Sequence, residues 1–110
     1  MIDAVHGAGQ VSGREVDKWS RFGFKPLKAS RISAPLVDGC LGWLECRVVD
    51  RSLAKQMDLL VCEAVAAWAE DDVFRNGEWS FTDPERRTIH HLSGGKFFLT
   101  GEARTAREQR

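Results

Sequence analysis

Two apolar runs in the middle of the chain dominate its hydrophobic pattern. Residues 40–68 read CLGWLECRVVDRSLAKQMDLLVCEAVAAW, and a polar segment at 51–56 separates the two runs. In the first run the even positions from 42 to 48 are small or apolar, whereas the odd positions include an aromatic and two charged residues. A strand turns alternate side chains to opposite faces. This alternation therefore predicts a strand over residues 41–50 with its apolar positions facing inward.

The second run, residues 58–68, also alternates, but its composition suits a helix as well. It is rich in Ala and Leu, which are good helix formers, and a helical stripe of apolar residues can be drawn through it. The strand-like neighbour and the short connector favour a second strand, paired antiparallel with the first. A register with Arg47 opposite Glu63 would match opposite charges across this hairpin.

The N-terminal segment is predicted to be helical in part. Residues 1–10 resemble the last turn of a helix entering a glycine-rich loop, where Gly7 and Gly9 suit positive φ or close backbone approach. Ser12, with a glutamate three residues later, has the spacing of a capping box and predicts a short helix. Gly23 is placed to end that helix.

The remaining segments are predicted to be extended and interrupted by turns. Prolines prevent a regular helix in residues 24–37, which are expected to form a connector with one short edge strand. Asn76 and Gly77 form a strong hairpin-turn signal between two short apolar stretches. A further short apolar run follows at residues 97–99. Together these signals predict a mainly β domain with short helices.

Composition excludes several classes of protein. The chain has 110 residues, which predicts one domain over residues 1–100 with a charged tail at 101–110. The 16 basic residues balance the 16 acidic ones, which argues against a general nucleic-acid binder. No apolar run is long enough to span a membrane and no signal peptide is recognised, so a cytoplasmic protein without a membrane partner is expected.

The cysteines and histidines do not suggest a metal site. An odd count of three cysteines (Cys40, Cys46 and Cys62) predicts free thiols, and their places in the runs predict small buried side chains. His90 and His91 are adjacent, so they point in different directions on any regular element. We therefore expect no metal ion.

Two motifs carry a family resemblance. The segments AGQVSGREVDKWSRFGF, at residues 8–24, and KASRISAPLVDGCLGWLECRVVD, at residues 28–50, together resemble the flavin reductase-like, FMN-binding split-barrel family in its flavoredoxin-like branch. HHLSGGKFF, at residues 90–98, is similar to a region of His or aromatic residues and glycines near the end of that family's domain. The resemblance covers residues 5–99.

The resemblance implies a fold and a chemistry. The fold would be a partial FMN-binding split β-barrel that forms a homodimer and holds FMN non-covalently near the subunit interface. The activity would be NAD(P)H-dependent flavin reduction or flavin-mediated electron transfer, with flavin and nicotinamide as small-molecule partners. In such proteins the hydride chemistry belongs to the cofactor, and the protein contributes binding and electrostatics.

The motifs also imply cofactor-binding residues, although they assign no catalytic residue. Lys18 matches the lysine of the family's DK-aromatic motif, which lies near the flavin. A lysine cation there would stabilise the anionic reduced flavin by charge complementarity. His91 and Phe97 are expected to flank the flavin, and a histidine there suits proton traffic near neutral pH.

The sequence departs from the family pattern in three ways. It starts partway into the family domain, so the strands that carry most FMN contacts in relatives are expected to be missing. Met57 stands where the branch has a histidine, and Ala8 stands where relatives often carry a cysteine. These departures keep a second hypothesis open, in which the chain is a truncated non-catalytic remnant, or a dimerisation or interaction module, that does not bind flavin.

Overall fold

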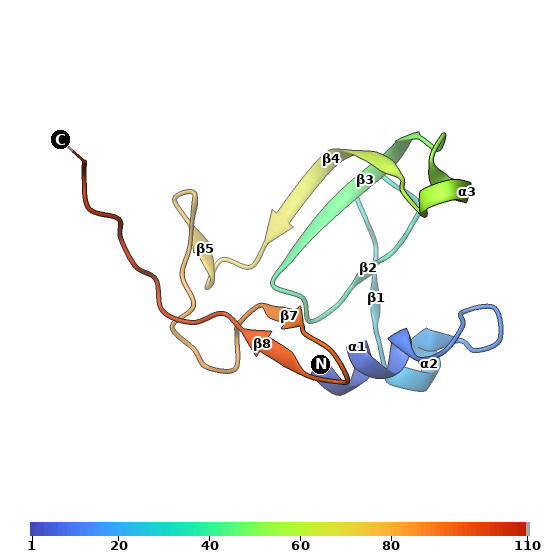
Figure 1. Ribbon diagram of the computed structural model, residues 1–110, viewed down its shortest axis with the longest axis horizontal. Helices are drawn as coiled ribbons and strands as arrows, with labels where there is room; N and C mark the ends of the chain where they lie inside the picture. The colour runs from blue at the N-terminus through green and yellow to red at the C-terminus, as the bar shows by residue number, and fades with distance from the viewer. Residues whose placement is uncertain (110) are drawn as a thin grey trace.

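The computed structural model describes residues 1–109 and shows a chain of short helices and antiparallel ribbons (Figure 1). The helices are α1 (Ile2–Gly9), α2 (Lys18–Phe22) and α3 (Ala54–Met57). The strands are β1 (Pro26–Leu27), β2 (Leu36–Val37), β3 (Gly42–Asp50), β4 (Val61–Ala69), β5 (Phe74–Arg75), β6 (Glu78–Trp79), β7 (Ile89–His91) and β8 (Phe97–Leu99). Each strand pairs with its neighbour in sequence, giving four two-stranded sheets. The predicted mainly β class with short helices is confirmed.

The β3–β4 hairpin is the longest element and follows the predicted pairing. Its two strands are antiparallel and nine residues long, and Arg47 lies opposite Glu63, as predicted. No ion pair joins these two residues in the part of the chain that is described. The helical alternative for residues 58–68 is wrong.

The turns of two hairpins use residues suited to left-handed backbone. After α3, Asp58 takes φ 51° and turns the chain into β4. Asn76 and Gly77 have φ values of 53° and 79°, as the two central residues of a type I′ turn require. The predicted hairpin at Asn76–Gly77 is thus confirmed, with β5 and β6 on either side.

The cap of α2 differs from the prediction. The Asp17 side chain accepts a hydrogen bond from the Trp19 backbone N–H at 3.1 Å and another from the Ser20 hydroxyl at 2.8 Å. The predicted cap, Ser12, instead accepts from the Arg14 N–H at 3.2 Å in a turn that precedes the helix. Asp17 directly precedes the first turn of α2, where its carboxylate accepts a hydrogen bond from a backbone N–H that has no partner within the helix. Asp17, and not Ser12, is therefore the N-cap residue of α2. Gly23 ends α2 at φ 70°, as predicted.

Helix α1 occupies the segment that was predicted to run mostly as a loop. Gly7 and Gly9 both lie inside it and neither has positive φ. Gly7 is nevertheless a point of close approach, because a Cβ atom there would lie 2.5 Å from the ring of Phe22 on α2. The glycine lets two short helices pack together, so that part of the prediction is confirmed.

The inward face of β3 is the predicted one only after Glu45, where Cys46 and Val48 are half-buried and the residue that follows each is exposed. Glu45 is the most buried side chain among residues 1–109, whereas Leu44 is 65% exposed. The pairing register shifts between Glu45 and Cys46, so the alternation of faces does not run unbroken along the strand. Cys40 and Cys46 are half-buried free thiols. Cys62 is an exposed one, so its predicted burial is wrong.

Within 1–109, no three His, Cys, Asp or Glu side chains converge as metal ligands do. No helix in that range combines the length and the hydrophobicity needed to cross a bilayer.

The contact between α1 and α2 yields a stability prediction with a control in the same helix. Gly9→Ala should stabilise the protein by about 0.5–1 kcal/mol, because alanine is the better helix former and nothing lies within 4 Å of the new methyl. Gly7→Ala should cost about 1–3 kcal/mol, because the methyl forces the Phe22 ring to move. Urea unfolding monitored by circular dichroism measures both. Equal stabilisation by the two substitutions would contradict the packing of α1 on α2.

Candidate functional site

A fully buried carboxylate, Glu45, ties three separate segments together. One oxygen, Oε1, accepts hydrogen bonds from the backbone N–H groups of Ser30 at 3.0 Å and Arg31 at 2.6 Å. The other, Oε2, accepts from the Ser30 hydroxyl at 3.0 Å and from the Trp68 indole N–H at 2.6 Å. The carboxylate therefore joins β3 to β4 and to the connector between β1 and β2.

These partners fix the charge of Glu45. Burial raises the pKa of a carboxyl, but the hydrogen bonds from Arg31, Trp68 and Ser30 outweigh that effect and bring the pKa of Glu45 to about 2. All of the donors are backbone or neutral side-chain groups. The site is thus a buried anion held by neutral dipoles, and it stays ionised at neutral pH.

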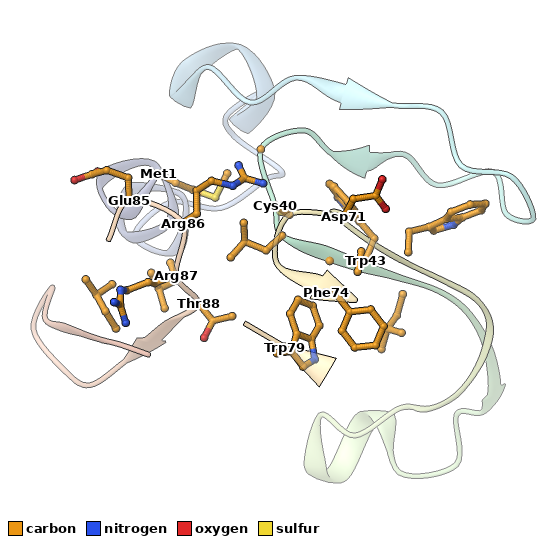
Figure 2. A pocket seen from close by; sticks show the side chains of 18 of the residues that line it. Met1, Cys40, Trp43, Asp71, Phe74, Trp79, Glu85, Arg86, Arg87 and Thr88 are labelled. Atoms are coloured by element: carbon orange, nitrogen blue, oxygen red, sulfur yellow. The ribbon is translucent and has the colours of Figure 1, made fainter. Parts of the chain in front are cut away.

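Two hollows adjoin this anchor. The smaller, of about 750 Å³, has Glu45, Ser30 and Trp68 among its lining residues. The larger, of about 910 Å³, shares Trp68 with the smaller and is bordered by the start of β3, the end of β4, the β5–β6 hairpin and residues 84–89 (Figure 2). Both volumes fall in the range typical of small-molecule pockets.

Aromatic rings form one wall of the larger hollow. The Trp79 ring lies 4.9 Å from the Phe74 ring and stacks at 5.7 Å on the Phe81 ring. In Figure 2, Phe74 and Trp79 lie together on one side of the hollow, with residues 85–88 on another. Gly42 lets Trp79 approach β3, because a Cβ atom there would lie 3.1 Å from the indole.

Two arginines border the hollow, and both are already paired. Arg86 donates a hydrogen bond to Asp72 Oδ1 at 2.8 Å, and its Nε lies 2.6 Å from Oδ2 without the alignment of a hydrogen bond. The hydrogen bond from Arg86 lowers the pKa of Asp72. Arg87 donates to the Thr100 carbonyl at 2.6 Å. These two guanidinium groups fix the chain that leads into β7 rather than standing free.

The residues predicted to bind a cofactor lie elsewhere. His91 and Phe97 face each other across the β7–β8 register, and their rings make an edge-to-face contact at 5.2 Å. Lys18 begins α2 and is half-buried. Neither hollow is lined by any of these three residues. The structure brings His91 and Phe97 together and leaves Lys18 on a different element.

Helix α1 lies between the two parts of this predicted site. On one side Gly7 contacts Phe22 of α2, the helix that Lys18 begins. On the other side the His6 ring lies against Gly95 in the β7–β8 turn, 3.3 Å from where a Cβ would stand. Figure 1 shows α1 beside α2 and next to the β7–β8 hairpin. Lys18 and the His91–Phe97 pair are therefore linked through one helix without direct contact.

Sequence reasoning missed the role of Glu45 and its indole partner. The signal was present, since a glutamate in the middle of an apolar strand must find donors or remain exposed. The sequence did not reveal which groups donate hydrogen bonds to Glu45, because Ser30 and Arg31 lie in an irregular connector. The larger hollow was missed too, since its walls come from segments far apart in the chain.

The structure defines the class of protein as a mainly β domain built from antiparallel hairpins. Its distinguishing features are the buried Glu45 carboxylate and the contact between the His91 and Phe97 rings. The family model described as the flavin reductase like domain matches residues 1–90. The chain belongs to the flavin reductase-like domain family. Its arrangement is part of the FMN-binding split β-barrel that the sequence motifs predicted.

Three known proteins are similar to this chain. An FMN-binding domain of a flavin reductases-like enzyme from Shewanella baltica OS155 has a solved structure that is 31% identical, with a TM-score of 0.88 over 96% of this chain and 58% of that one. The uncharacterized protein YddH of Escherichia coli K12 is 39% identical over 100 residues, which are 89% of this chain and 53% of YddH. An uncharacterized protein of Archaeoglobus fulgidus is 26% identical over 103 residues, covering 94% of this chain and 56% of that protein. This chain spans about half the length of the curated relatives it matches.

The buried anion yields a pH prediction. The folded pKa of Glu45 is about 2, below the ordinary value of 4.5, so its contribution to stability is fully present above about pH 4.5 and is lost as the pH falls towards 2. The unfolding free energy of the parent should exceed that of Glu45→Gln at pH 6, and the difference should shrink by pH 3. Urea unfolding at several pH values measures it.

The matched control is Glu63→Gln, which alters an exposed glutamate in the facing strand. This variant should differ little from the parent at any pH, because an exposed carboxylate gains little from folding. An unchanged gap between the parent and Glu45→Gln from pH 6 to pH 3 would contradict the ionised state of Glu45.

Proposed function

We propose that this chain is the FMN-binding part of a flavin reductase-like protein that takes part in NAD(P)H-dependent flavin reduction or flavin-mediated electron transfer. The observation that carries the proposal is the TM-score of 0.88 at 31% identity to a domain described as FMN-binding. A framework shared over 96% of the chain supports a shared ligand class.

Three side chains would hold the flavin. Lys18 forms no ion pair among residues 1–109, so its ammonium is available to an anionic group. His91 is exposed and Phe97 is half-buried beside it, so together they offer a ring edge and a hydrogen-bonding nitrogen to a planar ligand. This donor set fits the charge and the aromatic face of FMN, which would supply the hydride chemistry when bound.

The roles of these side chains follow from that chemistry. The Lys18 ammonium would stabilise negative charge on reduced flavin, where a fixed cation favours the charged form. His91 would hold or release a proton at a ring nitrogen, and Phe97 would orient the ligand and keep water from one face. A homodimer in the cytoplasm is part of this proposal, and the three free cysteines are in keeping with a reducing compartment.

Binding of FMN tests the proposal directly. Titration of the protein with FMN, followed by flavin fluorescence, should give saturable binding. Phe97→Ala should weaken that binding roughly 2- to 10-fold, because an aromatic pair contributes ~0.5–1.5 kcal/mol beyond burial. The control is Phe98→Ala, which removes the neighbouring, exposed phenylalanine of β8 and should leave the affinity unchanged. Absence of FMN binding by the folded parent would overturn the proposal.

The lysine yields a second test in the redox potential. Lys18→Ala should weaken the binding of reduced flavin more than that of oxidised flavin, and so lower the midpoint potential of bound FMN. A charge-assisted contact of ~1.5–3 kcal/mol corresponds to a fall of roughly 30–60 mV for a two-electron couple. His91→Ala should shift the potential less, because an imidazole carries a full charge only when protonated.

Spectroelectrochemical titration measures these potentials, and Lys55→Ala on α3 is the control. Lys55 is exposed and lies in the β3–β4 connector, so its removal should leave the potential where it is. Equal potentials for Lys18→Ala and the parent would remove Lys18 from the site and leave it as a surface residue of α2.

A second candidate function is an interaction module that binds no flavin. The observation in its favour is the exposed apolar surface, since 15 large hydrophobic side chains of the described residues are exposed. A folded protein that fails to bind FMN but associates with another polypeptide would favour this function over the first.

A further inference from the structure

Positive charge is concentrated in one segment of a chain whose formal net charge is zero. Residues 18–37, termed here the basic segment, contain five basic residues and no acidic one. The five are Lys18, Arg21, Lys25, Lys28 and Arg31. Residues 70–85 show the opposite balance, with six acidic residues and one basic residue. The two kinds of charge are therefore separated along the chain rather than mixed.

The two charged regions lie on different elements of the fold. The basic segment runs over α2, β1 and β2, whereas residues 70–85 follow β4 and form the β5–β6 hairpin. Figure 1 shows α2 and β5 towards the right and the left of the view. The regions approach each other at the smaller hollow, which Lys28 lines together with Glu70 and Asp71. The separation seen in the sequence is thus largely kept in space.

The cations of the basic segment are accessible and have no acidic partner. All five side chains are exposed or half-buried. Among residues 1–109, the basic members of ion pairs are Arg86 and Arg104, which lie outside the segment. The carboxylate of Asp17, directly before the segment, is occupied as the cap of α2. A cluster of like charges repels itself and attracts an oppositely charged ligand.

The backbone of the basic segment is held in place. Glu45 accepts hydrogen bonds from the N–H groups of Ser30 at 3.0 Å and Arg31 at 2.6 Å. The Trp43 indole donates to the Val37 carbonyl at 2.7 Å. The basic side chains therefore project from a fixed backbone. A surface that is ordered before binding loses less entropy when a partner arrives.

The spacing of the cations favours a large partner. Lys25, Lys28 and Arg31 follow one another at intervals of three residues, along a stretch that includes β1. An extended chain advances about 3.3 Å per residue, so the outer two stand up to about 20 Å apart. One phosphate group or one small carboxylic acid cannot reach all three. A surface that bears several carboxylates can.

We infer that the basic segment is a docking surface for a protein that presents a cluster of carboxylates. Complementary charge of this kind speeds association and orients the partner. Residues 70–85 add to the orientation, because they repel an acidic partner from that part of the molecule. Lys18 belongs to the proposed flavin site, so the partner lies beside that site. This last consequence rests on the proposed function, whereas the docking itself does not.

Two other occupants fit the basic segment less well. Nucleic acid is a continuous polyanion that would extend past the segment and meet residues 70–85. The Phe24 ring also contacts Trp19 at 6.4 Å and Phe22 at 6.5 Å, which leaves less ring surface on which bases could stack. A second copy of this chain would offer residues 70–85, but there Asp72 is already paired with Arg86.

Binding of a polyglutamate peptide tests the inference without any flavin. The labelled peptide is titrated with the full chain and followed by fluorescence anisotropy. We expect saturable binding whose affinity falls about tenfold or more between about 0.02 and 0.3 M salt, because salt screens exposed charges. A duplex oligonucleotide with the same number of negative charges should bind more weakly.

Two matched double variants locate the surface. Arg21→Glu with Lys25→Glu reverses two cations of the basic segment. Arg51→Glu with Lys55→Glu makes the same change at the same spacing, on exposed residues of the β3–β4 connector. The first should weaken peptide binding roughly tenfold or more, because each reversal replaces an attraction with a repulsion, and the second less than about twofold. Circular dichroism checks that both remain folded, and the single variants Lys25→Glu and Lys55→Glu repeat the comparison with less disturbance.

Several results would overturn the inference. They are the absence of saturable peptide binding, equal losses in the two double variants and in the two single ones, and tighter binding of the oligonucleotide. Self-association of the parent at low salt that Arg21→Glu with Lys25→Glu abolishes would also overturn it, because a second copy would then occupy the segment.

Discussion

The Glu45 carboxylate is the interaction on which the arrangement of this chain depends. Four donors surround it, and three of them come from a connector about 15 residues earlier in the sequence. The fourth is the indole of Trp68, a residue of the facing strand. Without a buried anion these donors would have no common target. Of the hydrogen bonds among residues 1–109, the segment would keep only the one from the Trp43 indole to the Val37 carbonyl in β2, at 2.7 Å, to hold it on the β3–β4 hairpin. The charge is stabilised by dipoles alone, so it requires each donor to hold its position.

Two regions of the chain bear on function. On one side, the β3–β4 hairpin presents Trp68 and Leu44 to a hollow shared with the β5–β6 hairpin and the end of β8. On the other, α1 connects α2 to the β7–β8 turn, and so relates Lys18 to the His91–Phe97 pair. The second region is the one for which flavin binding is proposed.

Elements that depend on local chemistry could be predicted from the sequence. The alternation of residues 41–50 gave the strand, and the Asn76–Gly77 pair gave its hairpin, because both signals act within a few residues. The opposition of Arg47 and Glu63 followed from pairing two such strands. The cap of α2 was misassigned because Ser12 and Asp17 are both good capping residues, and the choice between them depends on where the helix begins.

Elements that depend on distant segments could not be predicted in the same way. The inward face of β3 was predicted wrongly up to Glu45, because the register shift after that residue and the donors at Ser30 and Arg31 decide which side chain is buried. The hollow could not be foreseen, since its wall joins Met1 to Trp79 and Leu99. The family motifs did identify the fold. They also named Lys18, His91 and Phe97, whose part in flavin binding stays a prediction.

Amide hydrogen exchange at Ser30 and Arg31 tests the account most directly. Both N–H groups lie in an irregular connector and have Glu45 as their acceptor. They should exchange much more slowly than the neighbouring amides of the connector, and this protection should disappear in Glu45→Gln. Exchange of both amides at the rate of their neighbours in the parent protein would contradict the claim that the buried carboxylate holds the connector on the hairpin.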